Sequence, residues 1–452
     1  MRTGKVTGHE PSIRAGNYDL LTPEAVARAQ RDADRLLEQV GLEIRDHPVA
    51  RERLEAAGAR VVGERVHFEP GLARAIVQEH APRGFVQRAR NASHDIAFGG
   101  NGTFTAPAAG PPMVRGRDGR RRYGTLRDHD DFARLTQRFG SIDHAGGMYC
   151  EIMDHGTAVR HLYGLSRTLQ LTDKAVMGPA RTPGQVRDCL DMIRVVFGSD
   201  RVDRECCLLS LFNLEPPLVL QGETVEGMRL TAEANQACLV TSYTVLGMNA
   251  PVTTGTTLAL MLAEIEAGIA LVQLFRPGTP VIAGIYGVPF SMSAMRPAFG
   301  SIESMMLMCA GAQLVRTLGC PVRGDGAVTS AKLPDAQAGR DTGFGLTCAH
   351  VAGVDFALQS AGWLEGGLVT SLDKFRLDAA GIASVRAMQY AGEEGVPTES
   401  PNESGTMSLK ELSSLLDACE DPPMDDSTRD ALERFVAEKR AAAGHEIDDS
   451  SG

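Results

Sequence analysis

The feature that most constrains the fold is an eightfold alternation of short apolar runs with longer helical segments. The apolar runs are predicted strands that start near Thr103, Ile142, Lys174, Cys206, Cys238, Pro280, Pro321 and Val354. Predicted helices follow them at 127–138, 157–169, 183–197, 224–235, 253–275, 301–318, 336–351 and 372–388. Eight such units are typical of an α/β fold of the (β/α)8 TIM barrel type. A doubly wound sheet fits six or seven of the units equally well, so the count of eight is what favours the barrel.

The predicted barrel occupies residues 101–395 and leaves a segment on either side. Residues 1–100 are predicted to form an N-terminal α+β cap, whose first helix starts after Thr22 because Pro23 suits a first helical position. Residues 396–452 are predicted to form an acidic C-terminal tail with two helices. This tail contributes most of the net charge of −11, so the cap and barrel together are close to neutral.

Charge and hydropathy exclude two classes of partner. A net charge of −11 argues against a general nucleic-acid binder, which needs a basic surface to neutralise phosphates. The longest apolar run, at 258–275, is interrupted by Glu264 and Glu266, so no membrane span is expected. The first sixteen residues have no apolar core of the kind that a signal peptide carries.

The cysteines and histidines indicate the compartment and argue against a metal site. The nine cysteines include no C-x-x-C pair, which is typical of reduced thiols in the cytoplasm. Cys206 and Cys207 are adjacent at the start of a predicted strand, where neighbouring side chains point to opposite faces. His155 and His350 are isolated in the sequence, so we expect no protein-bound metal.

The carboxyl ends of the predicted strands are where a barrel enzyme carries its active site. The scarce aromatic residues are concentrated there, at Tyr149, Tyr243, Tyr286, Phe290 and the only tryptophan, Trp363. Acidic residues accompany them at Glu151, Asp154 and Asp325. Aromatic faces beside carboxylates suit a quaternary ammonium or a similar cation. Ordinary packing of the aromatics with solvated acids remains the alternative interpretation.

The run GAVTSAKLPDAQAG at Gly326–Gly339 resembles the trimethylamine methyltransferase family, which includes glycine betaine methyltransferases. The stretches LTPEAVARAQRDADRLLEQVGLEI, VTTGTTLALMLAEIEAGIALVQLFRPGTPV and AGWLEGGLVTSLDKF are similar to the same family, and the resemblance covers roughly residues 20–390. The resemblance implies a (β/α)8 barrel that moves a methyl group from a methylated amine to the cob(I)alamin of a separate corrinoid protein. Val328 stands where the trimethylamine enzymes carry pyrrolysine, which favours the pyrrolysine-free branch acting on quaternary amines.

The resemblance implies roles for the residues at the strand ends. The aromatic residues Tyr149, Tyr243, Tyr286, Phe290 and Trp363 are candidates to surround the ammonium. Glu151, Asp154 and Asp325 are the candidate catalytic acids, which supply negative potential. Arg296, Arg323 and Lys332 are candidates to anchor a substrate carboxylate.

Several alternatives remain open at this stage. The donor is a quaternary amine or another small onium compound, such as a sulfonium betaine. Tetrahydrofolate or a thiol is the alternative methyl acceptor, and a non-catalytic betaine-binding barrel is the alternative to an enzyme. The cofactor expected is cobalamin carried by a partner corrinoid protein, and a cytoplasmic homo-oligomer is expected.

Overall fold

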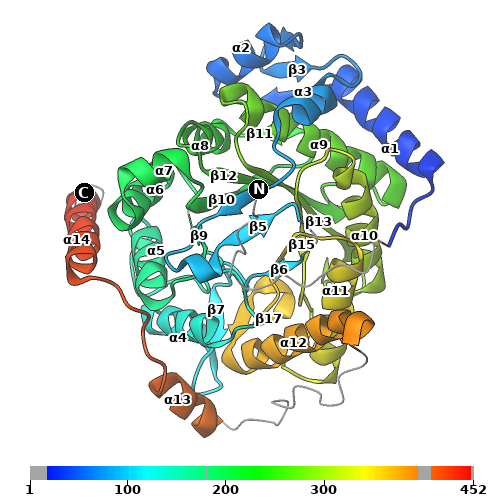
Figure 1. Cartoon of the computed structure of the whole chain (residues 1–452). Helices are drawn as coiled ribbons and strands as arrows, with labels where there is room; N and C mark the ends of the chain where they lie inside the picture. The colour runs from blue at the N-terminus through cyan, green and yellow to red at the C-terminus, as the bar shows by residue number, and fades with distance from the viewer. Residues whose placement is uncertain (1–17, 101, 180, 395–408, 449–452) are drawn as a thin grey trace.

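The computed structural model describes residues 18–100, 102–179, 181–394 and 409–448. Its centre is a curled parallel sheet with the strand order β6-β16-β15-β13-β12-β10-β9 (Figure 1). The strands are β6 (Phe104–Thr105), β9 (Val176–Gly178), β10 (Leu208–Leu214), β12 (Ala237–Leu246), β13 (Val281–Ser291), β15 (Val322–Asp325) and β16 (Phe356–Leu358). Residues between Asp143 and Gly146 join the two ends of this order, so the predicted α/β barrel is confirmed.

Closure of the barrel depends on a segment too short to count as a full strand. The amide of His144 donates to the carbonyl of Thr105 on β6, over 3.0 Å, and the amide of Ala145 donates to Ala175, over 2.8 Å, just before β9. The buried ammonium of Lys174 holds the start of this segment. It donates to the carbonyls of Thr136, Phe139 and Ile142 over 2.6–3.0 Å, and burial lowers its pKa to about 8.

Helices surround the barrel as an outer ring (Figure 1). They are α4 (Leu126–Arg138), α5 (Arg160–Leu171), α6 (Pro183–Phe197), α8 (Gly222–Glu233), α9 (Thr254–Phe275), α10 (Ile302–Arg316), α11 (Ala336–Val351) and α12 (Leu372–Glu394). A short additional helix, α7 (Ser199–Arg204), follows α6. Each lies within a few residues of a predicted helix, except α12, which runs past the predicted end, and α7, which was not predicted. Local signals explain the accuracy, since Thr125 caps α4 in a capping box with Asp128 and Thr182 caps α6 before Pro183.

Helix α9 is the one described helix that is long and apolar enough to cross a membrane. Its most apolar window is 89% buried inside the protein, where it packs against α1, α3, α10 and the sheet. It also carries two buried acids. Glu264 accepts from Ser242 Oγ and the amide of Leu218, and Glu266 accepts from Arg74 Nε at 2.8 Å. These features are those of a core helix.

The N-terminal segment builds an α+β layer against α9. It comprises α1 (Pro23–Arg35), a π-helical turn (Leu36–Val40), β1 (Leu42–Ile44), α2 (Pro48–Ala56), β2 (Arg60–Val62), β3 (Arg65–His67) and α3 (Leu72–His80). Strand β1 also pairs in parallel with β11 (Val219–Leu220), which belongs to a barrel loop. The segment therefore shares both a sheet and an apolar core with the barrel. The domain boundary at residue 100 stays a prediction.

A hairpin covers the amino-terminal end of the barrel, which we call the floor. Strands β4 (Phe85–Gln87) and β5 (Ile96–Phe98) form this hairpin, and in Figure 1 it lies across the barrel centre. The ring of Phe98 lies 5.6 Å from that of Phe104 and 5.5 Å from that of Phe356, edge to face in both cases. Because these rings belong to one buried cluster with residues near the starts of β9, β10, β12 and β13, the floor is an apolar plug.

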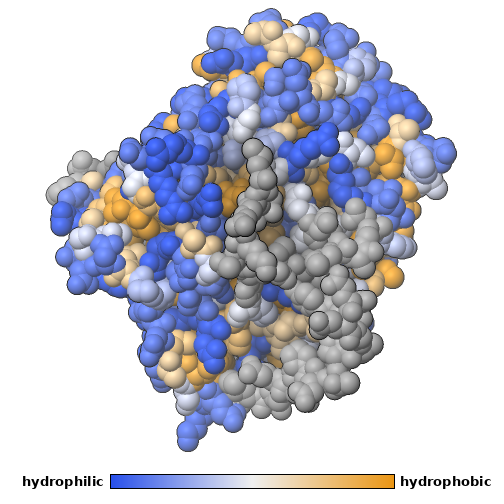
Figure 2. Space-filling view, viewed as in Figure 1, coloured by the Kyte–Doolittle hydropathy of each residue, from blue (hydrophilic) through white to orange (hydrophobic). Residues whose placement is uncertain are grey.

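The C-terminal segment packs against the outside of the helical ring. Its helices are α13 (Leu409–Asp417), which contacts α4, and α14 (Asp426–Asp448), which contacts α5 and α6. Leu432 is fully buried, and Lys439 Nζ lies 2.7 Å from a carboxylate oxygen of Asp188. On the face of the molecule that Figure 2 shows, which is the face seen in Figure 1, the coloured residues are mostly hydrophilic and the hydrophobic ones lie in separate groups.

Candidate active site

Two tyrosines stack at the carboxyl end of the barrel, which we call the mouth. Tyr243 on β12 and Tyr286 on β13 occupy paired positions in the sheet register. Their rings lie 4.7 Å apart with an interplanar angle of 21°. Adjacent parallel strands place residues at one level side by side, which is why positions 43 apart in sequence meet here. Burial and the nearby Asp325 raise the pKa of Tyr243, so its hydroxyl stays protonated.

A buried ion pair lies next to the stack. Arg323 and Asp325 are two residues apart on β15, so both side chains point to the same face of the strand, toward the barrel lumen. Arg323 Nη2 donates to Asp325 Oδ1 over 2.7 Å. The guanidinium carbon of Arg323 lies 4.9 Å from the ring centroid of Tyr286. Burial raises the pKa of Asp325 to about 7, although Arg323 opposes the shift. The carboxyl is therefore poised between its two forms near neutral pH.

Trp363 extends the aromatic surface from the connection after β16. It lies on β17 (Trp363–Leu364), which pairs with β18 (Val369–Ser371), and β18 in turn pairs with β7 (Met113–Arg115). Phe299 lies between Trp363 and Tyr286, with centroid distances of 5.6 and 6.0 Å. Gly367 leaves room for the indole, because a Cβ at this left-handed position would lie 2.5 Å from Trp363 Cζ2.

Three buried polar atoms at this end find no hydrogen-bond partner among the residues that the structure describes. They are Trp363 Nε1, Arg323 Nε and Thr241 Oγ1. Thr241 lies on the lumen face of β12, two residues before Tyr243, opposite Gly284. Unsatisfied buried polar groups are rare in native structures and often mark a place where a ligand or an ordered water completes the site.

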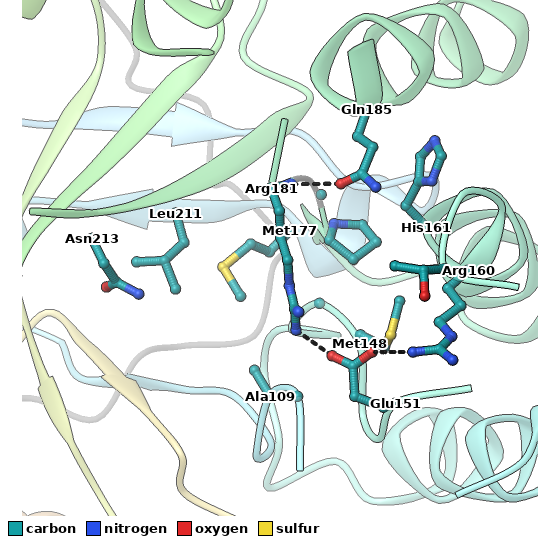
Figure 3. Close-up of a pocket in the computed structure, with 15 residues that line it drawn as sticks. Ala109, Met148, Glu151, Arg160, His161, Met177, Arg181, Gln185, Leu211 and Asn213 are labelled. Atoms are coloured by element: carbon teal, nitrogen blue, oxygen red, sulfur yellow. Dashed lines mark hydrogen bonds and ion pairs between the residues drawn. The ribbon is translucent and has the colours of Figure 1, made fainter. Parts of the chain in front are cut away.

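A cavity of about 260 Å³ opens on the neighbouring part of the mouth (Figure 3). Leu211 and Asn213 of β10 and Met177 of β9 line its inner side, and Asn213 is paired in register with Thr241. Glu151 lies on the opposite side, ion-paired with Arg181 and, at 3.7 Å, with Arg160, as the dashed lines show. The mouth thus has an aromatic part over β12, β13 and β15 and an ionic part over β9 and β10.

The structure places some of the remaining predicted residues beside the aromatic part and others away from it. Phe290 does pack against the same apolar cluster as Tyr286. Arg296, on β14 (Arg296–Pro297), and Lys332, on the loop after β15, are exposed. Arg296 donates to the carbonyl of Ser330 over 3.4 Å and lines a second open cavity together with Phe299. Asp154 caps the amino terminus of α4 through the amide of Leu126, at 3.0 Å.

Tyr149 differs most from its expected position. It is 1% exposed and packs in a cluster with residues of α4 and α12, and its ring lies 5.0 Å from that of His129. The side chain therefore points into the helical layer rather than into the barrel. The strand ahead of it is irregular, so the inward or outward direction of its side chain does not follow from the alternation of a regular strand.

Several residues of the site were missed from the sequence, Phe299 and Arg181 among them. The β13–β14 hairpin reverses the chain and brings Phe299 back to the mouth. Phe299 therefore does not directly follow a predicted barrel strand, which is where the sequence analysis looked for site residues. Arg181 follows β9 directly, and the strand-end rule applied strictly would have found it. Val328 is buried in the same apolar cluster as Tyr286, Phe299 and Trp363.

Among the described residues, no group of three or more His, Cys, Asp or Glu side chains is arranged to hold a metal ion. Burial raises the pKa of most of the cysteine thiols, Cys189 and Cys238 among them, which makes those poor thiolate ligands or nucleophiles. The groups that the described part of the mouth offers are aromatic faces, the carboxyls of Asp325 and Glu151, and the arginines paired with them.

Comparisons with known proteins agree with this architecture. A glycine betaine methyltransferase from Desulfitobacterium hafniense is 34% identical over 368 residues, 80% of this chain and 75% of that protein. A proline betaine:corrinoid methyltransferase from Eubacterium limosum is 30% identical over 162 residues, 36% of this chain and 33% of that protein. The monomethylamine methyltransferase of Methanosarcina barkeri has the same fold, with a TM-score of 0.52 at 9% identity over 94% of this chain and 96% of its own.

The family model for trimethylamine methyltransferase matches residues 2–399, which is most of the chain. The match includes the segment after β15 and the connection that carries Trp363, where the resemblance in the sequence was noted. Because both the family model and a relative of 34% identity cover most of its length, this methyltransferase belongs to the trimethylamine methyltransferase family.

Proposed function

We propose that this protein transfers a methyl group from a carboxylate-bearing quaternary amine, such as glycine betaine, to the cobalt of a corrinoid carried by a partner protein. The observation that carries the proposal is the stacked tyrosine pair beside the buried Arg323–Asp325 pair at the barrel mouth. The betaine substrates named for two relatives support the same substrate class.

The substrate is a zwitterion, and the site offers complementary groups for both of its charges. The ring faces of Tyr243 and Trp363 attract a quaternary ammonium through their quadrupoles, by about 0.5–2 kcal/mol for each good contact. Tyr286 supports them from behind, because it stacks on Tyr243 and lies under the guanidinium of Arg323. Ionised Asp325 adds negative potential. Arg323 has an unpartnered Nε–H that suits a carboxylate, and Arg323 serves as the anchor in this proposal.

The chemical step needs no proton transfer from the enzyme. When the carbon–nitrogen bond breaks, its electron pair stays on nitrogen, which leaves as a neutral tertiary amine. The reduced corrinoid cobalt, as the second substrate, supplies the electron pair for the new bond to the methyl carbon. The residues of the mouth orient one methyl outward and exclude water. They bind the ammonium weakly enough that its loss of positive charge in the transition state is not opposed.

The protein is mixed with reduced cobalamin and glycine betaine, and the loss of cob(I)alamin absorbance is followed in the visible spectrum. Loss of the signal is expected with glycine betaine or another betaine or sulfonium compound, and trimethylamine is the control for which none is expected. Absence of change with the whole panel would overturn the proposal. Turnover only with tetrahydrofolate or a thiol would show that one of these compounds, and not a corrinoid, is the methyl acceptor.

The cytoplasmic localisation and the homo-oligomeric state are part of this proposal. All nine cysteines are free thiols, which supports a reducing compartment. Size-exclusion chromatography with light scattering measures the oligomeric state directly, and a monomer at micromolar concentration would contradict the prediction.

A further inference from the structure

A crescent of exposed apolar side chains borders the aromatic part of the mouth. It consists of Met248, Val252, Met292, Met295, Leu333 and Leu368, which are between 49% and 76% exposed. All six lie on connections that follow barrel strands: two after β12, two at the tip after β13, one after β15 and one after β16. Because the strands are parallel, these connections meet at one end of the barrel.

Large apolar side chains on successive loops are unusual on a protein surface. Contiguous exposed apolar patches mark places where a partner covers them. Three of the six are methionines, whose flexible and polarisable side chains adapt to a partner surface. The crescent lies over the strands that carry Tyr243, Tyr286 and Asp325, so a partner bound to it sits directly at the reacting end.

We propose that this crescent is the docking surface for the corrinoid protein that carries the methyl acceptor. The proposal rests on the function proposed above. The floor is plugged by the β4–β5 hairpin and its phenylalanines, so an acceptor reaches the substrate only through the mouth. A second copy of this chain on the same surface would block that approach, which favours the acceptor carrier as the occupant.

Charges beside the crescent suit the same partner. Arg296 is adjacent to Met295, and Lys332 is adjacent to Leu333, and both cations are exposed. A partner surface that is apolar at its centre and acidic at its rim complements this arrangement, and the corrinoid carrier is proposed to present such a surface around its corrinoid. In this proposal the two cations contribute to docking.

The test compares two acceptors in variants of the crescent. In the double variant Met292→Asp/Met295→Asp, the KM for the cobalamin-loaded corrinoid protein should rise at least tenfold. The rate of methyl transfer from glycine betaine to free cob(I)alamin should stay within twofold of the wild type, because the tip lies outside the aromatic cluster. Val62→Asp is the matched control, since Val62 is 55% exposed but lies on β2, away from the mouth, and its KM should not change.

The outcomes separate this proposal from the proposed function. An unchanged KM for the corrinoid protein overturns the docking surface while the function stands. An equal loss with free cob(I)alamin also overturns it, because the tip would then serve the substrate site. A wild-type oligomer that dissociates in the double variant shows that a second copy covers the crescent. A wild type that uses neither acceptor overturns the function, and the docking proposal with it.

Discussion

The floor and the mouth of the barrel are built from the same strands but by opposite rules. At the floor, Phe98, Phe104 and Phe356 fill the space with carbon, and their edge-to-face contacts stabilise the fold. At the mouth, the strands present tyrosines, an arginine and a carboxyl, and some buried polar atoms are left without partners. The difference teaches that stability is concentrated at one end, while binding capacity is held at the other.

The largest effect on stability is expected at the floor. Phe98→Ala removes a fully packed ring and leaves a cavity, which should lower the free energy of unfolding by about 3–5 kcal/mol. Urea unfolding measures this loss. The KM for glycine betaine should stay unchanged in the folded variant, and an altered KM would show that the two ends are coupled rather than separate.

The largest effect on catalysis is expected from the buried ion pair at the mouth. Arg323→Met removes the carboxylate anchor and should lower kcat/KM for glycine betaine about 100-fold, which corresponds to about 3 kcal/mol for a charged hydrogen bond. Choline, which has no carboxylate, is the matched substrate and should lose less than glycine betaine does, because it loses only the attraction of Asp325, whose pKa rises further without Arg323. An equal loss of choline binding would mean that Arg323 only supports the fold.

The protonation of Asp325 gives a pH dependence that the floor does not share. Burial raises its pKa to about 7, so the carboxyl is protonated below this pH and its negative potential is lost. The kcat/KM for a permanently charged betaine should therefore fall about tenfold for each pH unit below 7. In Asp325→Asn the profile should be flat across this range, at the low level. A wild-type profile that is flat from pH 5 to 8 would remove Asp325 from the site.

A smaller effect is expected from the indole. Trp363→Ala removes one aromatic face, which should weaken substrate binding by about 1–2 kcal/mol and raise the KM roughly 5–30-fold. Gly367→Ala provides an independent check, since the added Cβ would displace the indole without removing it. If the KM and kcat of Trp363→Ala equal those of the wild type, the ring only packs.

The smallest effect is expected from Tyr149, which lies in the helical layer. Its hydroxyl makes no hydrogen bond of ordinary geometry to the described residues, although Thr136 and Thr168 lie close enough to lower the pKa of the phenol. Tyr149→Phe should therefore change neither the KM nor the kcat and should change the free energy of unfolding by no more than about 1 kcal/mol. A change of tenfold or more in the KM would place Tyr149 at the mouth and would contradict its assignment to the helical layer.

Much of the fold was predictable because its signals are local. The capping residues Thr125 and Thr182 and the apolar strand of β12 each specify an element without reference to distant parts of the chain. The short closing segment near His144 was harder, because it is held by the buried ammonium of Lys174 and by hydrogen bonds to β6, not by a strong apolar run.

The candidate site was predictable where residues alternate along regular strands. Tyr243, Tyr286, Arg323 and Asp325 lie on β12, β13 and β15, whose pleat fixes which side chains face the lumen. Tyr149, Asp154, Arg296 and Lys332 lie on irregular segments, where no period dictates the direction of a side chain. Phe299 was missed for the same reason.

By itself, the amino-acid sequence determined the eight strand–helix units, the family and the residues that reach the mouth from regular strands. These follow from local periodicity, caps and side-chain alternation, which act over a few residues at a time. Only the tertiary structure decided which of those residues meet. Burial next to Arg323 and the tyrosines sets the protonation of Asp325, and the plugged floor leaves the mouth as the approach to the site, since both result from contacts between segments far apart in the chain.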